Sequence, residues 1–252
     1  MCEMCRQISI PRFGPSRRSL LFGAASTMGL LLANAAVAKE KEKKKEKEKK
    51  APPKPENVLS PDAALKRLRK GNERYVEGES RHHDFRHERE ALAGGQNPYA
   101  AILSCADSRI APEYAFDTGR GDLFVCRVAG NFANNETIAS LEYAVAVLST
   151  PLILVLGHES CGAVDATIKS LKDDTTLPGH MSSLVTAIAP AVKAVSQQGG
   201  DTLAKAIRQN VVDNVAKLRS ATPILSAAVE QGKLKVVGGT YRLKDGKVDM
   251  VA

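Results

Sequence analysis

The sequence predicts one doubly wound α/β domain over residues 57–252, built on a mostly parallel sheet flanked by helices. Short apolar runs of strand length alternate there with longer segments whose apolar residues recur at helical spacing. The clearest run, residues 151–156, has no polar side chain, which is typical of a parallel strand covered on both faces. A hydrophobic content of 43% in 252 residues is enough for a full-sized core, and no internal repeat divides the chain.

The individual elements follow from local signals. Ser60-Pro61-Asp62 predicts a helix start with a serine cap, and this helix runs to about residue 77. Expected strands cover residues 100–104, 123–128, 151–156 and 233–240. Further helices are expected at 137–148, from 162 onward, at 181–196, 201–219 and 223–231, with a polar loop at 172–180. Residues 242–249 predict a hairpin that turns at Asp245-Gly246 and adds an antiparallel edge strand.

Residues 1–38 resemble an export signal. A segment at 16–21 resembles the twin-arginine signal, an apolar segment covers 20–37, and Ala36-Val37-Ala38 matches a cleavage site. We expect cleavage and a periplasmic protein; an uncleaved signal would instead attach the protein to the cell envelope, and this is the only membrane contact we expect. Residues 39–56 are rich in Lys, Glu and Pro and predict a disordered linker before the domain.

The positive charge belongs to this N-terminal region. The formal net charge of the chain is +8, of which residues 1–38 contribute +3 and residues 39–50 contribute +4. The remaining residues therefore carry only +1 and offer no basic stripe, so we expect no nucleic-acid partner.

The cysteines do not form a disulfide framework. Cys2 and Cys5 fall in the signal, and the mature chain keeps Cys105, Cys126 and Cys161, an odd number without a close pair. Cys126 lies within an expected strand and is interpreted as a small core residue. Zinc bound in the reducing cytoplasm, before export of the folded protein, would protect the other two thiols.

Cys105, His158 and Cys161 are the candidate metal ligands. They follow two predicted strands, and strand ends converge in an open α/β sheet. Two thiolates and an imidazole suit Zn²⁺ best, and three protein ligands leave an open position for water. Residues 81–87 contain three further histidines, which we interpret as exposed side chains because no matching second ligand set is present.

Asp107 and Arg109 lie close to the first ligand. An arginine within hydrogen-bonding range keeps an aspartate ionised, and the ionised Asp107 would accept the proton of zinc-bound hydroxide in a hydrogen bond and so orient the hydroxide. Alternatively, Asp107 itself takes the fourth zinc position and closes the site. Both arrangements are compatible with the sequence.

Together, Cys105-Ala-Asp107-Ser-Arg109 and His158-x-x-Cys161 resemble the β-class carbonic anhydrases, and the similarity covers most of residues 60–252. The resemblance implies reversible hydration of CO₂ to bicarbonate and a proton, by attack of zinc-bound hydroxide on CO₂, with one Zn²⁺ per subunit. It also implies four parallel strands and a homodimer or tetramer, in which the helix at 60–77 packs on the neighbouring subunit. Gly162 is expected beside the substrate.

One departure concerns regulation. Family members that are inhibited by bicarbonate bound away from zinc have Trp three positions before the first cysteine, where this chain has Ile102. We therefore expect the open form, with Asp107 paired to Arg109 near pH 7. Two rival functions remain: a COS or CS₂ hydrolase on the same scaffold, and a non-catalytic exported zinc-binding protein. The second would not need Asp107 and Arg109.

Overall fold

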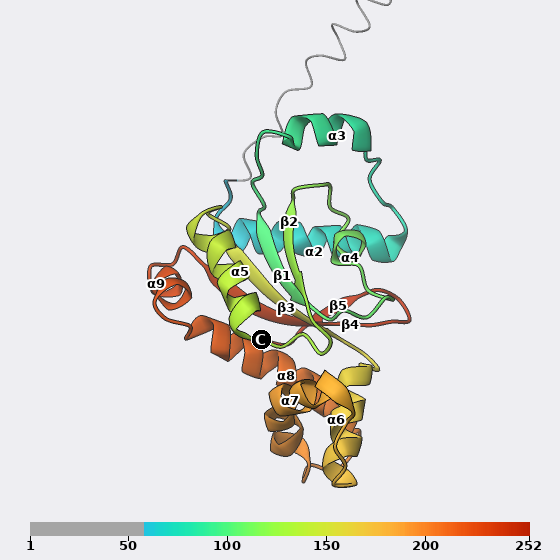
Figure 1. The fold of residues 1–252 in the computed structure, drawn as a ribbon. Helices are drawn as coiled ribbons and strands as arrows, with labels where there is room; N and C mark the ends of the chain where they lie inside the picture. Colours follow the sequence, from blue (N-terminus) through green and yellow to red (C-terminus); the bar gives the residue numbers. More distant parts are fainter. Residues whose placement is uncertain (1–57) are drawn as a thin grey trace, which may run out of the picture. The chain divides into compact units, whose positions relative to one another are not determined.

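The computed structural model describes residues 58–252, so the expected export signal and linker lie outside the described residues. Its centre is a five-stranded sheet in the order β2-β1-β3-β4-β5 (Figure 1). The strands are β1 (Ala100–Ser104), β2 (Leu123–Arg127), β3 (Leu152–His158), β4 (Lys235–Tyr241) and β5 (Val248–Met250). The first four are parallel and β5 pairs antiparallel to β4, which confirms the predicted fold class and the edge hairpin.

Helices surround this sheet. They are α2 (Pro61–Glu77), α3 (Phe85–Leu92), α4 (Pro112–Ala115), α5 (Asn135–Ala146), α6 (Gly162–Lys172), the 3-10 turn η1 (Gly179–Met181), α7 (Ser182–Val195), α8 (Thr202–Arg219) and α9 (Ile224–Glu230). The helices α3 and α4 were not predicted, and the turn η1 falls at the end of the polar loop expected at 172–180. The helix α3 buries none of its residues and α4 has only four, so neither produces an apolar pattern that the sequence could reveal.

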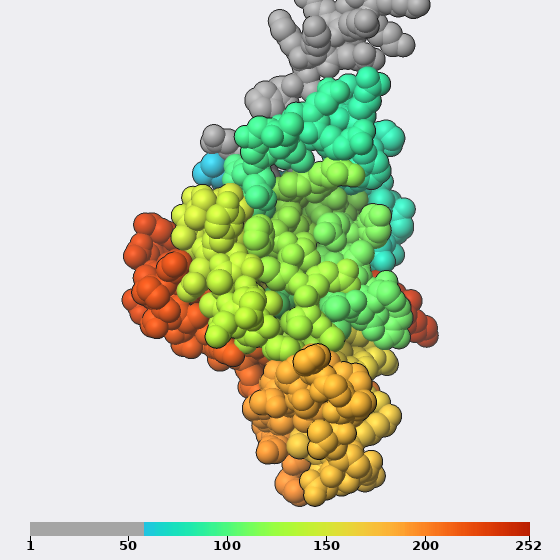
Figure 2. Space-filling model, in the orientation of Figure 1, coloured from blue at the N-terminus to red at the C-terminus, as the bar shows by residue number. Residues whose placement is uncertain are grey.

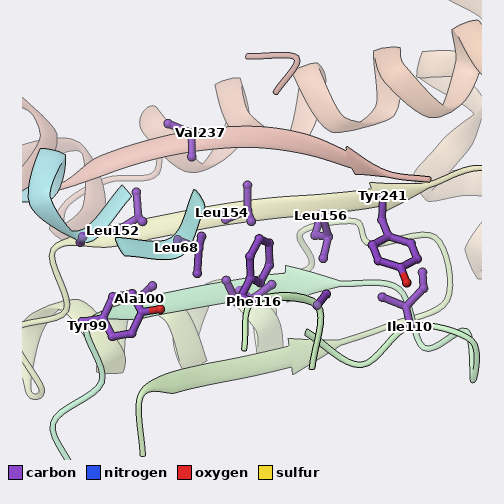
Figure 3. Close-up of a cluster of buried hydrophobic side chains, with 13 residues drawn as sticks. Leu68, Tyr99, Ala100, Ile110, Phe116, Leu152, Leu154, Leu156, Val237 and Tyr241 are labelled. Carbon is purple, nitrogen blue, oxygen red and sulfur yellow. The ribbon is translucent and has the colours of Figure 1, made fainter. Parts of the chain in front are cut away.

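One face of the sheet is covered by α2. Ser60 caps this helix by accepting a hydrogen bond from the Ala63 N–H, as predicted, and Leu68 is its largest buried side chain. Figure 3 shows Leu68 next to Phe116 and close to Leu154 of β3, within one apolar cluster. The buried stripe of α2 therefore packs on the sheet of its own subunit.

The opposite face is covered by α5, α8 and α9 (Figure 1). The helix α5 begins at Asn135, two residues before the predicted start, because Asn134 and Thr137 form a reciprocal capping box. Cys126 is half-buried on β2 and packs against this cluster, since β2 is an outer strand of the sheet.

A third cluster joins α6, α7 and α8 to the ends of β1 and β3. In Figure 2 the gold and orange residues of α6 and α7 gather beside the green residues that follow β1 and β2. Cys105 and Cys161 belong to this cluster, and Phe132 and Ile188 pack in it as well. Among residues 58–252, no helix combines the length and apolar character needed to cross a membrane.

Candidate metal centre

The candidate site lies at the topological switch point of the sheet, beside β1. From β1 the chain adds β2 on one side of the sheet and then β3 on the other. Such a switch point opens a crevice at the carboxyl ends of the strands, where ligands bind in doubly wound folds. Cys105 directly follows β1, His158 is the last residue of β3, and Cys161 is the N-cap residue of α6.

The three candidate ligands meet as the sequence predicted. One potential ligand atom from each of Cys105, His158 and Cys161 lies within 4.8 Å of the other two, and all three residues are buried. The two sulfur atoms are 4.0 Å apart. Two sulfurs bound at about 2.3 Å to one tetrahedral ion would be separated by about 3.8 Å, so the spacing fits zinc.

His158 is held in the orientation that a metal ligand requires. Its Nδ1 lies 2.8 Å from the Glu159 carbonyl oxygen, to which it donates, so Nε2 carries the free lone pair. Nε2 is buried and has no hydrogen-bond partner among the described residues. A backbone carbonyl that fixes the other ring nitrogen is the usual support of a metal-bound histidine. The orphaned Nε2 therefore points to a cation at this position.

The two thiols favour a single negative charge shared between them. The hydrogen bond from the Cys161 thiol lowers the pKa of Cys105 to about 4, opposed by burial and helped by the Gly130 N–H. The same thiol pair and burial raise the pKa of Cys161, because a second thiolate beside the first is unfavourable. The N–H groups of Ala163 and Val164, at the start of α6, act in the opposite direction. A divalent ion would allow both sulfurs to ionise.

Asp107 and Arg109 form a bidentate ion pair beside the ligands. Arg109 donates from Nε and Nη2 to the two carboxylate oxygens at 2.9 and 2.8 Å, and its backbone N–H adds a third bond at 2.9 Å. These hydrogen bonds hold the pKa of Asp107 well below its usual range. Arg109 also donates to the Ser160 carbonyl, which links the two ligand segments. Asp107 Oδ2 lies 3.9 Å from His158 Nε2.

Arg127 is a structural support that the sequence analysis missed. From the end of β2 its guanidinium donates to the carbonyl oxygens of Cys105, Asp107 and Ile110, at 2.9, 2.7 and 2.8 Å. It thereby fixes the backbone of the loop that carries the first ligand. The sequence does show that Arg127 is a charged residue at the end of an otherwise apolar strand, and such a residue needs polar partners nearby.

The remaining candidates are placed as follows. Gly162, the first residue of α6, is exposed, and a Cβ added there would meet no atom within 4 Å, so space is open beside it. The histidines of residues 81–87 form no metal-ligand group within residues 58–252. His82 is exposed as expected, whereas His83 and His87 are half-buried. His83 lies 3.2 Å from Glu88 and 3.9 Å from Asp117, and these carboxylates account for its partial burial.

Comparisons with known proteins agree with this geometry. Residues 100–248 match the family model described as carbonic anhydrase. Carbonic anhydrase 2 of Mycobacterium tuberculosis is 42% identical over 189 residues, covering 75% of this chain and 91% of that protein. The solved β-carbonic anhydrase CcaA matches with a TM-score of 0.59 at 28% identity, over 75% of this chain and 91% of that one. A tetrameric β-carbonic anhydrase of Sordaria macrospora shares the fold, with a TM-score of 0.60 at 22% identity over 73% and 94%.

The family match covers more than half of the chain and contains both ligand segments. The similarity to the mycobacterial relative extends over nearly the whole of that protein. This chain belongs to the β-class carbonic anhydrase family.

Proposed function

We propose that this chain hydrates CO₂ reversibly to bicarbonate and a proton with one Zn²⁺ per subunit, held by Cys105, His158 and Cys161. The observation that carries the proposal is the donor set itself: two sulfurs 4.0 Å apart beside a buried imidazole nitrogen that has no hydrogen-bond partner among the described residues. No other group of three such ligand atoms lies together within residues 58–252. The chemistry of this set suits zinc.

When bound, zinc supplies Lewis acidity that lowers the pKa of a water from 15.7 to about 7 and so provides a nucleophile at neutral pH. The chain supplies orientation. Asp107 stays ionised because Arg109 donates two side-chain hydrogen bonds to it, so its carboxylate only accepts. By accepting a hydrogen bond from the attacking water, Asp107 would direct the lone pair of that water towards CO₂. We place the substrate beside Gly162, where the site is open.

The pairing of Asp107 with Arg109 supports an open metal position. While Arg109 holds both carboxylate oxygens, Asp107 is not available as a fourth ligand. Ile102 is fully buried within β1, in the position where members inhibited by bicarbonate are expected to have Trp. We propose that the enzyme is open near pH 7 for these two reasons.

We further propose a homodimer that can pair into a tetramer. The outer strand β2 has one edge without a partner strand among the described residues, and its apolar side chains are only half-buried. Tyr143 of α5 lies next to Phe124 of β2 and remains 47% exposed, so apolar surface continues from the strand to the helix. The tetrameric relative from Sordaria macrospora supports this reading. Analytical ultracentrifugation tests it, and a monomer at micromolar concentration would contradict it.

Export to the periplasm is a separate proposal that rests on the sequence of residues 1–38. Replacing Arg17 and Arg18 by Lys is expected to retain the protein in the cytoplasm at full length. Cell fractionation followed by N-terminal sequencing measures this. Export and cleavage of the double variant at the wild-type rate would show that the twin-arginine signal is not used.

The decisive experiment for the activity is stopped-flow CO₂ hydration by the zinc-loaded full chain, with zinc content measured alongside. Cys105→Ser is expected to lose zinc and activity together, whereas Cys126→Ser, a matched control on β2, keeps both. Zinc bound without CO₂ hydration would favour a non-catalytic zinc-binding protein. Faster turnover of COS or CS₂ than of CO₂ would favour the hydrolase alternative.

A further inference from the structure

We propose that Asn210 of α8 is a positioning residue for the metal centre, acting through the Gly130 backbone on the sulfur of Cys105. The inference rests on the proposed zinc function, because it concerns how one of the zinc ligands is supported. Asn210 is 2% exposed, and its side-chain amide donates to the Gly130 carbonyl at 2.8 Å. The Gly130 N–H donates to Cys105 Sγ at 3.3 Å.

This connection runs through a backbone that has little freedom to move. Gly130 has φ +86°, a left-handed conformation that favours glycine. A Cβ at this position would lie 2.5 Å from Cδ1 of Ile188, so the loop passes tightly against α7. The direction of the Gly130 N–H therefore depends on how this residue is anchored. Asn210 provides the anchor from the α8 side.

A second asparagine fixes the first. Asn214 lies one turn further along α8, is 6% exposed, and donates to the backbone carbonyl of Asn210 at 2.7 Å and to its Oδ1 at 3.1 Å. These bonds leave the Asn210 amide nitrogen directed at Gly130. Asn214 also accepts from the Ala133 N–H at 2.7 Å, so two points of the loop after β2 are held by one helix. Both asparagines occupy positions where an apolar residue would otherwise pack.

The chemical consequence concerns the thiolate. An N–H group that donates to a metal-bound sulfur withdraws charge from it and fixes its direction, and such partners tune the metal. The anchored Gly130 N–H faces Cys105 only, so it distinguishes the two sulfurs of the site. Asn210 contacts neither the ligands nor the open position, and its effect must appear in the sulfur–metal bond.

The test uses the full chain loaded with Co²⁺, whose sulfur-to-metal charge-transfer band reports on the thiolates directly. Asn210→Ala removes the donor, and Asn210→Asp keeps the size of the side chain but places an acceptor against the Gly130 carbonyl. Asn72→Ala is the matched control. Asn72 is also a buried asparagine that donates to two backbone carbonyls, both at 2.8 Å, but these lie at Ala115 and Gly246, outside the metal centre.

We expect both Asn210 variants to shift the charge-transfer band and to weaken Zn²⁺ binding on the order of 10-fold, measured by competition with a chelator. Asn72→Ala should be destabilised to thermal unfolding but should keep the wild-type band and affinity. A folded Asn210 variant with the wild-type band and affinity would overturn the proposal. So would Asn72→Ala causing the same changes, because the effect would then follow general loss of stability.

Asn214→Ala keeps the proposal testable if the Asn210 variants do not accumulate as folded protein. This variant leaves Asn210 in place but removes the bonds that orient it, so a smaller shift of the same sign is expected, and no shift contradicts the proposal. Failure of the underlying zinc function is distinct, because the wild-type chain would then bind neither Co²⁺ nor Zn²⁺ at the cysteines and would show no band at all.

Discussion

Replacing Arg109 by Ala should close the metal centre. In the wild type, Arg109 occupies both carboxylate oxygens of Asp107, and Oδ2 lies only 3.9 Å from His158 Nε2, the proposed ligand atom. Without the guanidinium, Asp107 has no bidentate partner and needs only a short movement to reach the metal. In this variant Asp107 should therefore become the fourth protein ligand and occupy the position that is open to water in the wild type.

The expected size of the effect follows from the bonds that are lost. Two charge-assisted hydrogen bonds would contribute several kcal/mol if they were buried, but the Arg109 side chain is 52% exposed and that of Asp107 18%. Because the guanidinium lies largely in solvent, the pair holds the carboxylate by its geometry more than by its strength. The ratio of closed to open form should therefore rise by about 5-fold at most.

The assay is stopped-flow CO₂ hydration at pH 7 with zinc content held equal. Arg109→Ala should lower kcat/KM several-fold, because the closed form gains population and the Asp107 carboxylate also loses the partner that orients it. Arg109→Lys keeps the charge but cannot donate two parallel hydrogen bonds, so it should lie between Arg109→Ala and the wild type. Arg89→Ala, on the exposed face of α3, is the matched control and should be unchanged. If Arg109→Ala keeps kcat/KM within twofold of the wild type, Arg109 does not hold the site open.

Three further outcomes concern stability and the support of the site. Burial raises the pKa of Asp117, but hydrogen bonds from Arg74 and the Arg81 N–H lower it on balance, so Asp117→Asn should cost about 1–2 kcal/mol at pH 7 by urea unfolding. Because the folded pKa is lowered, this difference should shrink as the pH falls below 3.8. Arg127→Met should lower the thermal midpoint and weaken zinc retention against a chelator on the order of 10-fold. Gly130→Ala should cost about 1–3 kcal/mol, part of which Ile188→Val restores by removing Cδ1.

Each of these outcomes has a result that would contradict it. A difference between wild type and Asp117→Asn that stays constant from pH 7 to pH 3 would show that the carboxylate is not stabilised by its arginines. Unchanged zinc retention in Arg127→Met would mean that the three carbonyl contacts do not position the Cys105 loop. For Gly130→Ala, the absence of any gain from Ile188→Val would place the whole cost in the backbone conformation.

The strands were the most predictable part of the fold. Buried parallel strands leave uninterrupted apolar runs, and β1 was predicted at its observed bounds. The predicted end of β3 lies two residues before the observed one. The run of apolar residues stops at Leu156, whereas hydrogen-bonded pairing with β4 continues to His158. Pairing partners decide where a strand ends, and these cannot be read from one segment. The helix α3 was not predicted because it buries none of its residues and so has no periodic apolar face in the sequence.

The ligands were predictable because cysteine and histidine at strand ends carry chemistry that few other residues share. Their supports were not. Arg127, Gly130 and Asn210 act through backbone groups, and a backbone donor leaves no trace in the residue type. The sequence does contain one sign of these supports: Asn210 and Asn214 lie four residues apart in the buried stripe of α8, whose apolar members include Ile207, Val211, Val215 and Leu218. Polar residues in such a stripe need partners, and here the partners lie in the loop before α5.

The most direct test of the central claim is X-ray absorption at the zinc edge of the purified full chain. Ligation by Cys105, His158 and Cys161 predicts two sulfur atoms per zinc at about 2.3 Å and one imidazole nitrogen at about 2.0–2.1 Å. Cys105→Ser should lose the zinc signal, and the sulfur count should stay at two in Cys126→Ser. A wild-type site with any sulfur count other than two, or a purified chain without zinc affinity, would contradict the account.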